Sequence, residues 1–318
     1  MVDGPIDLSV RLGTLALANP IMPASGTFSE ELARVFDLDL LGAFVTKTIT
    51  REKRSGNPTP RVAETASGML NSIGIPSKGL ANFLDEIVPA YRAFQQPLVA
   101  SISANTPDEF AQLCADVSVP GVAAIEVNIS CPNLEEDGRA FAMRPESTLS
   151  AMQKLRAASD KPLWAKLTPN TGEIAEVAAA AEAGGADAVV VANTILAMKI
   201  DVHTRRPSLG NIMGGLSGPA IKPIVVRMAY QCARAVSIPV IGCGGIATAE
   251  DVVEYLLAGC AAVQVGTATF LHPTAMTRII DDLAAYCRAN GVAAVRDLVG
   301  AVETGPLART DELLAQVY

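Results

Sequence analysis

Short apolar segments recur along the chain and alternate with segments whose apolar positions follow one helix face. The apolar segments predict eight strands, at residues 20–23, 43–46, 98–102, 124–128, 163–167, 188–191, 240–243 and 262–265. The other segments predict helices near residues 29–36, 79–94, 107–117, 146–158, 173–183, 219–236, 248–258 and 274–289. Alternation over residues 6–18 predicts a short N-terminal β-hairpin that turns near Leu12-Gly13-Thr14. Eight strand–helix units favour a closed (β/α)8 TIM barrel over a doubly wound sheet, which would alternate in the same way.

Composition agrees with a single α/β domain that spans residues 1–318. Half of the residues are hydrophobic but only 4% are aromatic, so the core is aliphatic, as in helices packed on a parallel sheet. The net charge of −8 and the lack of a basic cluster argue against nucleic acid as a partner. No apolar run approaches 18 residues and the N-terminus does not resemble a signal peptide, so we expect a soluble protein with no membrane partner.

The six cysteines are never closer than eleven positions, so no Cys-x-x-Cys pair exists. We therefore expect no metal site on this chain, neither zinc nor an iron–sulfur cluster. Free thiols fit a reducing compartment, which predicts a cytoplasmic protein.

Two predicted strand–helix connections are longer than a barrel needs, at residues 47–78 and 193–218. Long ordered loops in a compact domain usually carry function, and we expect these two to do so.

Polar residues follow most of the predicted strands, at the end where barrels bind their substrates. In chain order these positions hold Ser25 and Gly26, Lys47 and Thr48, Asn105, Asn128 and Cys131, Lys166, Asn193 and Thr194, Gly242 to Gly245, and Gly266 and Thr267.

The glycines after the seventh and eighth strands would let backbone N–H groups approach a phosphate, although glycine also makes tight turns. A buried lysine needs a partner, and a planar, amide-rich ligand such as a flavin ring would satisfy Lys47, Lys166 and the asparagines. A sugar phosphate would satisfy the lysines and glycines as well, so both ligands remain open.

Cys131 is the best candidate for proton transfer. It follows the apolar strand that Pro132 ends, and it stands among Asn128, Ser130 and Asn133. A lone cysteine is usually a small buried hydrophobe, but this one has polar neighbours at a strand end. The two histidines compete poorly for the role: His272 precedes a proline and His203 lies in a long loop beside two arginines.

Five motifs give the chain its resemblance to the class 1 dihydroorotate dehydrogenases of pyrimidine synthesis. They are Asn57-Pro-Thr-Pro-Arg-Val-Ala-Glu64, Gly68-Met-Leu-Asn-Ser-Ile-Gly74, Val127-Asn-Ile-Ser-Cys-Pro-Asn133, Gly214-Gly-Leu-Ser-Gly-Pro-Ala-Ile-Lys-Pro223 and Ile241-Gly-Cys-Gly-Gly-Ile246. The resemblance covers nearly the whole chain and is strongest to the NAD-linked subtype, class IB.

The resemblance implies sites for FMN and for dihydroorotate or orotate, with Cys131 as the catalytic base. FMN would contact Ser25, Gly26, Lys47, Thr48, Asn105, Asn128, Lys166 and Ala192, and its phosphate would contact Gly218, Gly244, Gly245, Gly266 and Thr267. Substrate would contact Lys47, Asn71, Ser72, Ile73, Gly74, Asn128, Asn193 and Thr194. The resemblance further implies a homodimer, or a heterotetramer with a partner subunit that carries FAD and a 2Fe–2S cluster.

The chain departs from the usual family pattern at three places: Ile75 to Gly79, Glu136 to Gly138, and Ala192 in place of a larger aliphatic residue. Within the same chemistry the alternatives are a fumarate-coupled dihydroorotate dehydrogenase and a dihydropyrimidine dehydrogenase. From another class, a Schiff-base aldolase would use Lys166 as its nucleophile and the glycines for a sugar phosphate.

Overall fold

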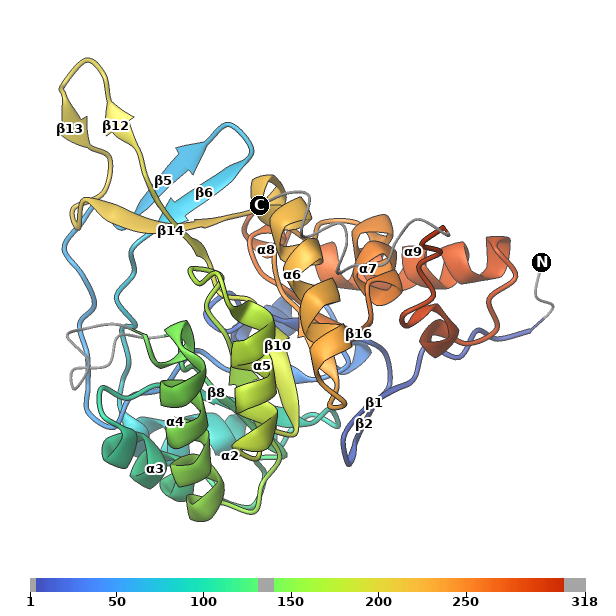
Figure 1. Cartoon of the computed structure of the whole chain (residues 1–318), viewed down its shortest axis with the longest axis horizontal. Helices are drawn as coiled ribbons and strands as arrows, with labels where there is room; N and C mark the ends of the chain where they lie inside the picture. Colours follow the sequence, from blue (N-terminus) through green and yellow to red (C-terminus); the bar gives the residue numbers. More distant parts are fainter. Residues whose placement is uncertain (1–3, 131–139, 306–318) are drawn as a thin grey trace.

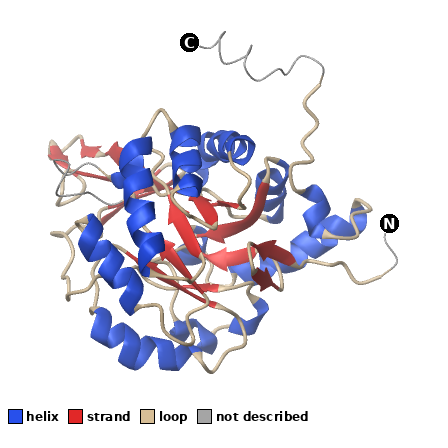
Figure 2. Ribbon diagram, turned by 60° about the horizontal axis from the view of Figure 1, so that its bottom comes forward, coloured by secondary structure: helices blue, strands red, loops and turns tan. Residues whose placement is uncertain are grey.

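The protein is described here by a computed structural model that covers residues 4–130 and 140–305. Its centre is a parallel sheet rolled into a barrel, with helices around the outside (Figures 1 and 2). The barrel strands within the described residues are β3 (Ile21–Pro23), β4 (Phe44–Val45), β7 (Leu98–Ile102), β8 (Ala124–Val127), β9 (Leu163–Lys166), β10 (Ala188–Val191), β15 (Val240–Gly242) and β16 (Cys260–Val265). All eight coincide with strands predicted from the apolar segments, which confirms the TIM-barrel prediction.

The sheet runs in the order β3-β16-β15-β10-β9-β8-β7-β4, which leaves β3 and β4 as its two ends. A backbone hydrogen bond from Gly42 N to Ile21 O, 2.8 Å long, joins these ends. A Cβ at position 42 would lie 2.2 Å from the Asn19 carbonyl oxygen, so only glycine allows the two strands to approach this closely.

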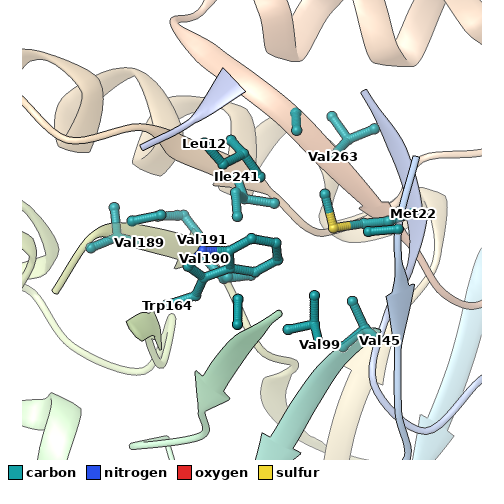
Figure 3. Close-up of a cluster of buried hydrophobic side chains, with 14 of the residues drawn as sticks. Leu12, Met22, Val45, Val99, Trp164, Val189, Val190, Val191, Ile241 and Val263 are labelled. Carbon is teal, nitrogen blue, oxygen red and sulfur yellow. The ribbon is translucent and has the colours of Figure 1, made fainter. Parts of the chain in front are cut away.

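The interior of the barrel is filled by side chains from alternate positions of the strands. Figure 3 shows the Trp164 indole directed toward Met22, Val45 and Val99, all of them buried. The N-terminal hairpin, β1 (Val10–Leu12) and β2 (Leu15–Leu17), forms where the alternation predicts it and buries Leu12 against the same core.

Most of the predicted helices form within one or two residues of their predicted positions. The helices are α1 (Leu80–Asn82), η3 (Phe83–Ile87, a π-helical turn), α2 (Val88–Tyr91), α3 (Pro107–Asp116), α4 (Pro145–Ala158), α5 (Ile174–Ala183), α6 (Lys222–Ala235), α7 (Ala249–Leu257), α8 (Ala268–Leu271) and α9 (Ala275–Ala289). The short 3-10 helices are η1 (Glu30–Arg34), η2 (Leu38–Leu40), η5 (Phe141–Met143), η6 (Pro219–Ile221) and η7 (Val295–Leu298).

The prediction for residues 29–36 is imprecise, because the segment forms only a 3-10 helix. The Ser29 side chain makes no capping hydrogen bond there. In contrast, the Thr106 and Thr248 side chains accept from the N–H groups of Glu109 and Asp251 and begin regular α-helices. In the described part of the chain no helix is long and apolar enough to cross a membrane.

The two long connections form a second sheet that the sequence patterns do not predict. It is antiparallel and contains β5 (Val62–Thr65), β6 (Gly68–Asn71), β11 (Ile195–Met198) and β14 (Met213–Ser217), in the order β11-β14-β6-β5. A two-stranded extension, β12 (Ile200–Asp201) and β13 (Arg206–Pro207), continues away from the barrel (Figure 1). Because β14 pairs with β6, segments about 145 positions apart are held side by side over one end of the barrel.

Candidate active site

A layer of polar side chains crosses the barrel interior near the carboxyl ends of the strands. Glu126 on β8, Lys166 on β9 and Gln264 on β16 are each at most 3% exposed. Lys166 Nζ donates to Gln264 Oε1 at 2.9 Å, and Gln264 Nε2 donates to Glu126 Oε2 at 2.6 Å. The Lys166 ammonium also lies 3.6 Å from Glu126 Oε1, so the two buried charges compensate each other.

This layer continues toward β7 and β4. Ser101 Oγ donates to Glu126 Oε1 at 3.0 Å, and the Thr48 and Ser101 hydroxyls are 3.0 Å apart. At the other end, Lys166 Nζ donates to Ser25 Oγ at 3.3 Å. The predicted residues Ser25, Thr48 and Lys166 are therefore connected through hydrogen bonds that span the barrel.

The charge state of Lys166 follows from its surroundings. Burial alone favours the neutral amine, but the Glu126 carboxylate outweighs burial and keeps the pKa of Lys166 above its ordinary value. Lys166 is therefore an ammonium ion at neutral pH. The Cys243 thiol beside it has a raised pKa because it is buried, so it remains protonated.

A second polar cluster joins the ends of β8 and β10. Asn193 Nδ2 donates to Ser130 Oγ at 2.6 Å and lies 3.4 Å from Asn128 Oδ1. Ser130 Oγ donates to Asn128 Oδ1, and Thr194 N donates to Asn193 Oδ1 at 2.8 Å. Amide groups held in this way can present both donors and acceptors to a ring that contains amides.

The second sheet brings Asn71 to this cluster. Asn71 pairs with Gly215 of β14, and a Cβ at Gly215 would lie 1.8 Å from Thr194 Oγ1. Thr194 therefore packs directly on the strand that pairs with Asn71. Ser72 accepts from Asn57 Nδ2 at 2.9 Å, and the Asn57 side chain also fills the space beside Gly74. Ile73 belongs to the same segment, because its carbonyl oxygen accepts from Asn57 N at 3.0 Å.

Lys47 completes the cationic side of the site. A Cβ at Gly26 would lie 3.4 Å from Lys47 Nζ, which places this ammonium beside the Ser25–Gly26 turn that Lys166 also contacts. Two lysines thus approach the same strand-end loop from β4 and β9.

Three glycine-containing loops meet at one side of the barrel end and form a cradle of backbone groups. A Cβ on Gly245 would lie 2.9 Å from the Gly218 carbonyl oxygen, and one on Gly218 would lie 3.6 Å from Thr267 Cγ2. The backbone N–H groups of Gly244, Gly245, Gly266 and Thr267 donate to no other residue in the described ranges. Unpaired N–H groups gathered in this way fit a phosphate.

Glycine at position 244 has a reason within the fold itself. A Cβ at Gly244 would lie 2.9 Å from Val225 of α6, which leaves no room for a side chain there. Gly244 is therefore required at least in part by helix packing. Gly266, in contrast, is not crowded by the fold, because the nearest neighbour of a Cβ there would be Ala24 Cβ at 3.4 Å.

Asn105 and Ala192, two of the predicted residues, are not joined to the polar clusters within the described part of the chain. The backbone N–H of Asn105 donates to Glu109 Oε2 at 3.2 Å, and Asn105 lines a separate 330 Å³ cavity with Thr50, Lys53 and Arg54. Ala192 is buried, and its N–H donates to Cys243 O at 3.0 Å. Cys131, the predicted base, lies outside the described residues.

The sequence patterns did not single out Glu126, Ser101 or Gln264. Each lies within an otherwise apolar strand, where the pattern predicts only a buried strand. A signal was available: Glu126 and Gln264 interrupt apolar segments that are buried on both faces, where a polar side chain needs a partner. The partner we expected for Lys166 was a ligand, but the chain supplies its own carboxylate and amide.

Comparisons with known proteins agree with the geometry. The family described as "Dihydroorotate dehydrogenase" matches residues 7–286. The chain is similar to proteins named "Dihydroorotate dehydrogenase B (NAD(+)), catalytic subunit" from Trichlorobacter lovleyi, 48% identical over 93% of this chain and 98% of the relative, and from Geobacter sulfurreducens, 46% identical over the same shares.

Among solved structures, a dihydroorotate dehydrogenase from Eimeria tenella, crystallised with ferulenol, shares the fold. Its TM-score is 0.76 at 22% identity, over 93% of this chain and 88% of the other. The barrel, its polar strand ends and the match over residues 7–286 lead to one assignment. The chain belongs to the dihydroorotate dehydrogenase family.

Proposed function

We propose that this chain is the catalytic subunit of an NAD-linked dihydroorotate dehydrogenase, which oxidises (S)-dihydroorotate to orotate for pyrimidine synthesis in the cytoplasm. The observation that carries the proposal is the buried Lys166 at the end of β9, in a member of this family, between the strands β8 and β10 that Asn128 and Asn193 follow. A Schiff-base aldolase needs a lysine that is neutral, whereas Lys166 is paired with Glu126.

FMN is the cofactor that the donor set fits best. Lys47, Lys166 and the Ser25–Gly26 turn would hold its ring, and the cradle of Gly218, Gly245 and Thr267 would hold its phosphate. Gly244, Gly266, Thr48, Asn105 and Ala192 remain proposed contacts. When bound, FMN would supply the acceptor for the hydride that leaves C6 of dihydroorotate.

The residues of this chain have two tasks toward the substrate. Lys47, Thr194 and the amides of Asn71, Asn128 and Asn193 would hold its carboxylate and ring amides, with Ser72 to Gly74 at the edge of the same site. Cys131, as a thiolate, would take the proton from C5, which the adjacent carbonyl makes more acidic.

We further propose that electrons reach NAD through a second subunit that carries FAD and a 2Fe–2S cluster. The relatives named above are called catalytic subunits, which supports a partner. The chain shows no Gly-x-Gly-x-x-Gly fingerprint for a dinucleotide. The expected assembly is a homodimer of this chain, extended to a heterotetramer with the partner.

The test is to purify the chain alone and mix it with dihydroorotate without oxygen. We expect a yellow protein whose flavin bleaches, reduces an artificial dye and does not reduce NAD. If the protein is colourless and borohydride traps a Schiff base between Lys166 and a carbonyl substrate, the chain is an aldolase instead. Fast turnover with fumarate would assign the chain to the fumarate-coupled subtype, and oxidation of dihydrouracil in preference to dihydroorotate would change the substrate.

The phosphate cradle has its own test, which needs no mutation. Protein stripped of flavin should bind FMN more tightly than riboflavin by a factor on the order of 10², because charge-assisted hydrogen bonds to several N–H groups would be lost. Equal affinities, measured by quenching of flavin fluorescence, would rule out the cradle as the phosphate site.

A further inference from the structure

We propose that Glu126 and Gln264 are positioning residues that keep Lys166 charged and directed at the electron-accepting edge of the flavin, and so set its reduction potential. The inference rests on the proposed function, because it requires a flavin above Lys166. Neither residue reaches the barrel mouth itself: Glu126 is fully buried and Gln264 is 1% exposed.

The hydrogen bonds fit an ionised Glu126 and a protonated Lys166. Gln264 bridges the two charges, with its carbonyl oxygen on the Lys166 ammonium and its NH₂ on the Glu126 carboxylate. Ser101 donates to the other carboxylate oxygen, so both oxygens of Glu126 act as acceptors. An ionised Glu126 carboxylate and a protonated Lys166 amine satisfy every hydrogen bond in this series.

The energetic cost of this arrangement argues for a role in function. A buried ion pair often stabilises a fold no more than apolar residues of the same volume do, because both ions lose their hydration. The preceding inward position on β9 is the apolar Trp164, so the barrel readily accepts apolar residues in its interior. The Glu126–Lys166 pair is therefore not explained by stability alone.

The groups that face Lys166 leave Glu126 as its counter-ion. Ser25 from the loop after β3 and Gln264 from β16 are neutral, and the buried Cys243 after β15 has a raised pKa that keeps it a thiol. Lys47 approaches the same loop with a second positive charge. Without the Glu126 carboxylate, burial and the positive charge nearby would both favour the neutral form of Lys166.

The effect on the flavin has a definite sign. The reduced flavin gains negative charge at the edge that a cation stabilises, so loss of the Lys166 charge should make reduction harder. A direct field from Glu126 would act in the opposite direction, because removing a negative charge should make reduction easier. The sign of the change in potential therefore distinguishes an action through Lys166 from a direct one.

The experiment is to measure the midpoint potential of the flavin against a reference dye in native protein and in Glu126→Gln. We expect the ratio of reduced to oxidised flavin at fixed solution potential to fall at least tenfold, which is about 30 mV for a two-electron couple. Combined with Lys166→Met, the same substitution should not lower the potential further. An unchanged or higher potential in Glu126→Gln alone would overturn the inference.

Two further variants serve as a second test and as a control for stability. Gln264→Met keeps both charges and removes the bridge, so it should lower the potential by a smaller amount, and no change there would overturn the role of Gln264. Thr148→Val removes a buried hydroxyl on α4, bonded to Phe141 O at 3.1 Å, and serves as the control that lowers stability without moving the potential. If Glu126→Gln does not fold, Gln264→Met decides the inference. A native protein that holds no flavin would instead refute the proposed function.

Discussion

Two consecutive inward-facing layers of the barrel are built on the same strands and have opposite chemistry. In the layer farther from the mouth, Val99 and Trp164 are apolar and fully buried. Two residues later on the same strands, Ser101 and Lys166 belong to the polar layer, together with Glu126. A repeat of two residues advances about 7 Å along a strand, so the change from core to site takes only one step.

The comparison teaches that stability and chemistry are separated by position along a strand. The apolar layer gains free energy from burial, whereas the polar layer uses hydrogen bonds and paired charges to offset the cost of its own burial. Variants of the apolar layer should change stability without changing the flavin potential, whereas variants of the polar layer should change the flavin potential.

The largest expected effect is on the apolar layer. Trp164→Ala removes a fully buried side chain and should lower the free energy of unfolding by about 3–5 kcal/mol. Protein that remains folded should keep the native flavin potential. Trp164→Phe should cost clearly less, because the indole Nε1 has no hydrogen-bond partner among the described residues and nothing is lost when that donor is removed. Urea unfolding measures the free energy of unfolding of both variants. A change in the flavin potential of Trp164→Ala would show that the two layers are not independent.

The same layers explain how much could be predicted from the sequence. Strands buried on both faces read as apolar runs, so all eight barrel strands were predicted from their residues. The second sheet could not be predicted, because β14 begins Met213-Gly-Gly and gains its order by pairing with Asn71 and its neighbours far away in the sequence. Polar residues outside strands, such as Asn128 and Asn193, were recognised, whereas Glu126 and Gln264 inside strands were not.

The second prediction concerns the predicted base beyond the described residues. Cys131→Ser should keep FMN and bind orotate, but reduce its flavin with dihydroorotate slower by a factor on the order of 10² or more. A thiol with an ordinary pKa of about 8.5 supplies some thiolate around neutral pH, and a serine hydroxyl does not. The residual rate should therefore rise with pH beyond the range where the native rate levels off.

Stopped-flow measurement of flavin reduction tests this without reference to the final acceptor. The free energy of unfolding should stay close to native, in contrast to Trp164→Ala. Cys131→Ala should be slower still, because no oxygen remains to relay the proton. If Cys131→Ala reduces its flavin at the native rate, the thiol is structural and the base lies elsewhere.

The smallest expected effect lies outside both layers, on the helix shell. Asp251 accepts from the N–H groups of Ala247 and Thr248 at the start of α7, and it pairs with Lys222 at 2.7 Å. Asp251→Ala removes this cap and ion pair and should lower the free energy of unfolding by about 1 kcal/mol. The flavin potential should not change, because Asp251 contacts neither interior layer.

The pH dependence of this effect follows from the pKa of Asp251. Burial alone would raise it, but the bonds from Lys222, Ala247 and Thr248 hold the pKa of Asp251 below its ordinary value in the folded protein. The unfolded chain therefore binds this proton first as pH falls, and the stabilisation is complete above the unfolded pKa of about 3.9 and lost as pH falls through the lower folded pKa. The difference in unfolding free energy between native protein and Asp251→Ala should accordingly be constant near neutrality and shrink in acid. If this difference in unfolding free energy instead grows below about pH 4, the fold favours the protonated Asp251 carboxyl, and the ion pair with Lys222 does not stabilise the helix shell.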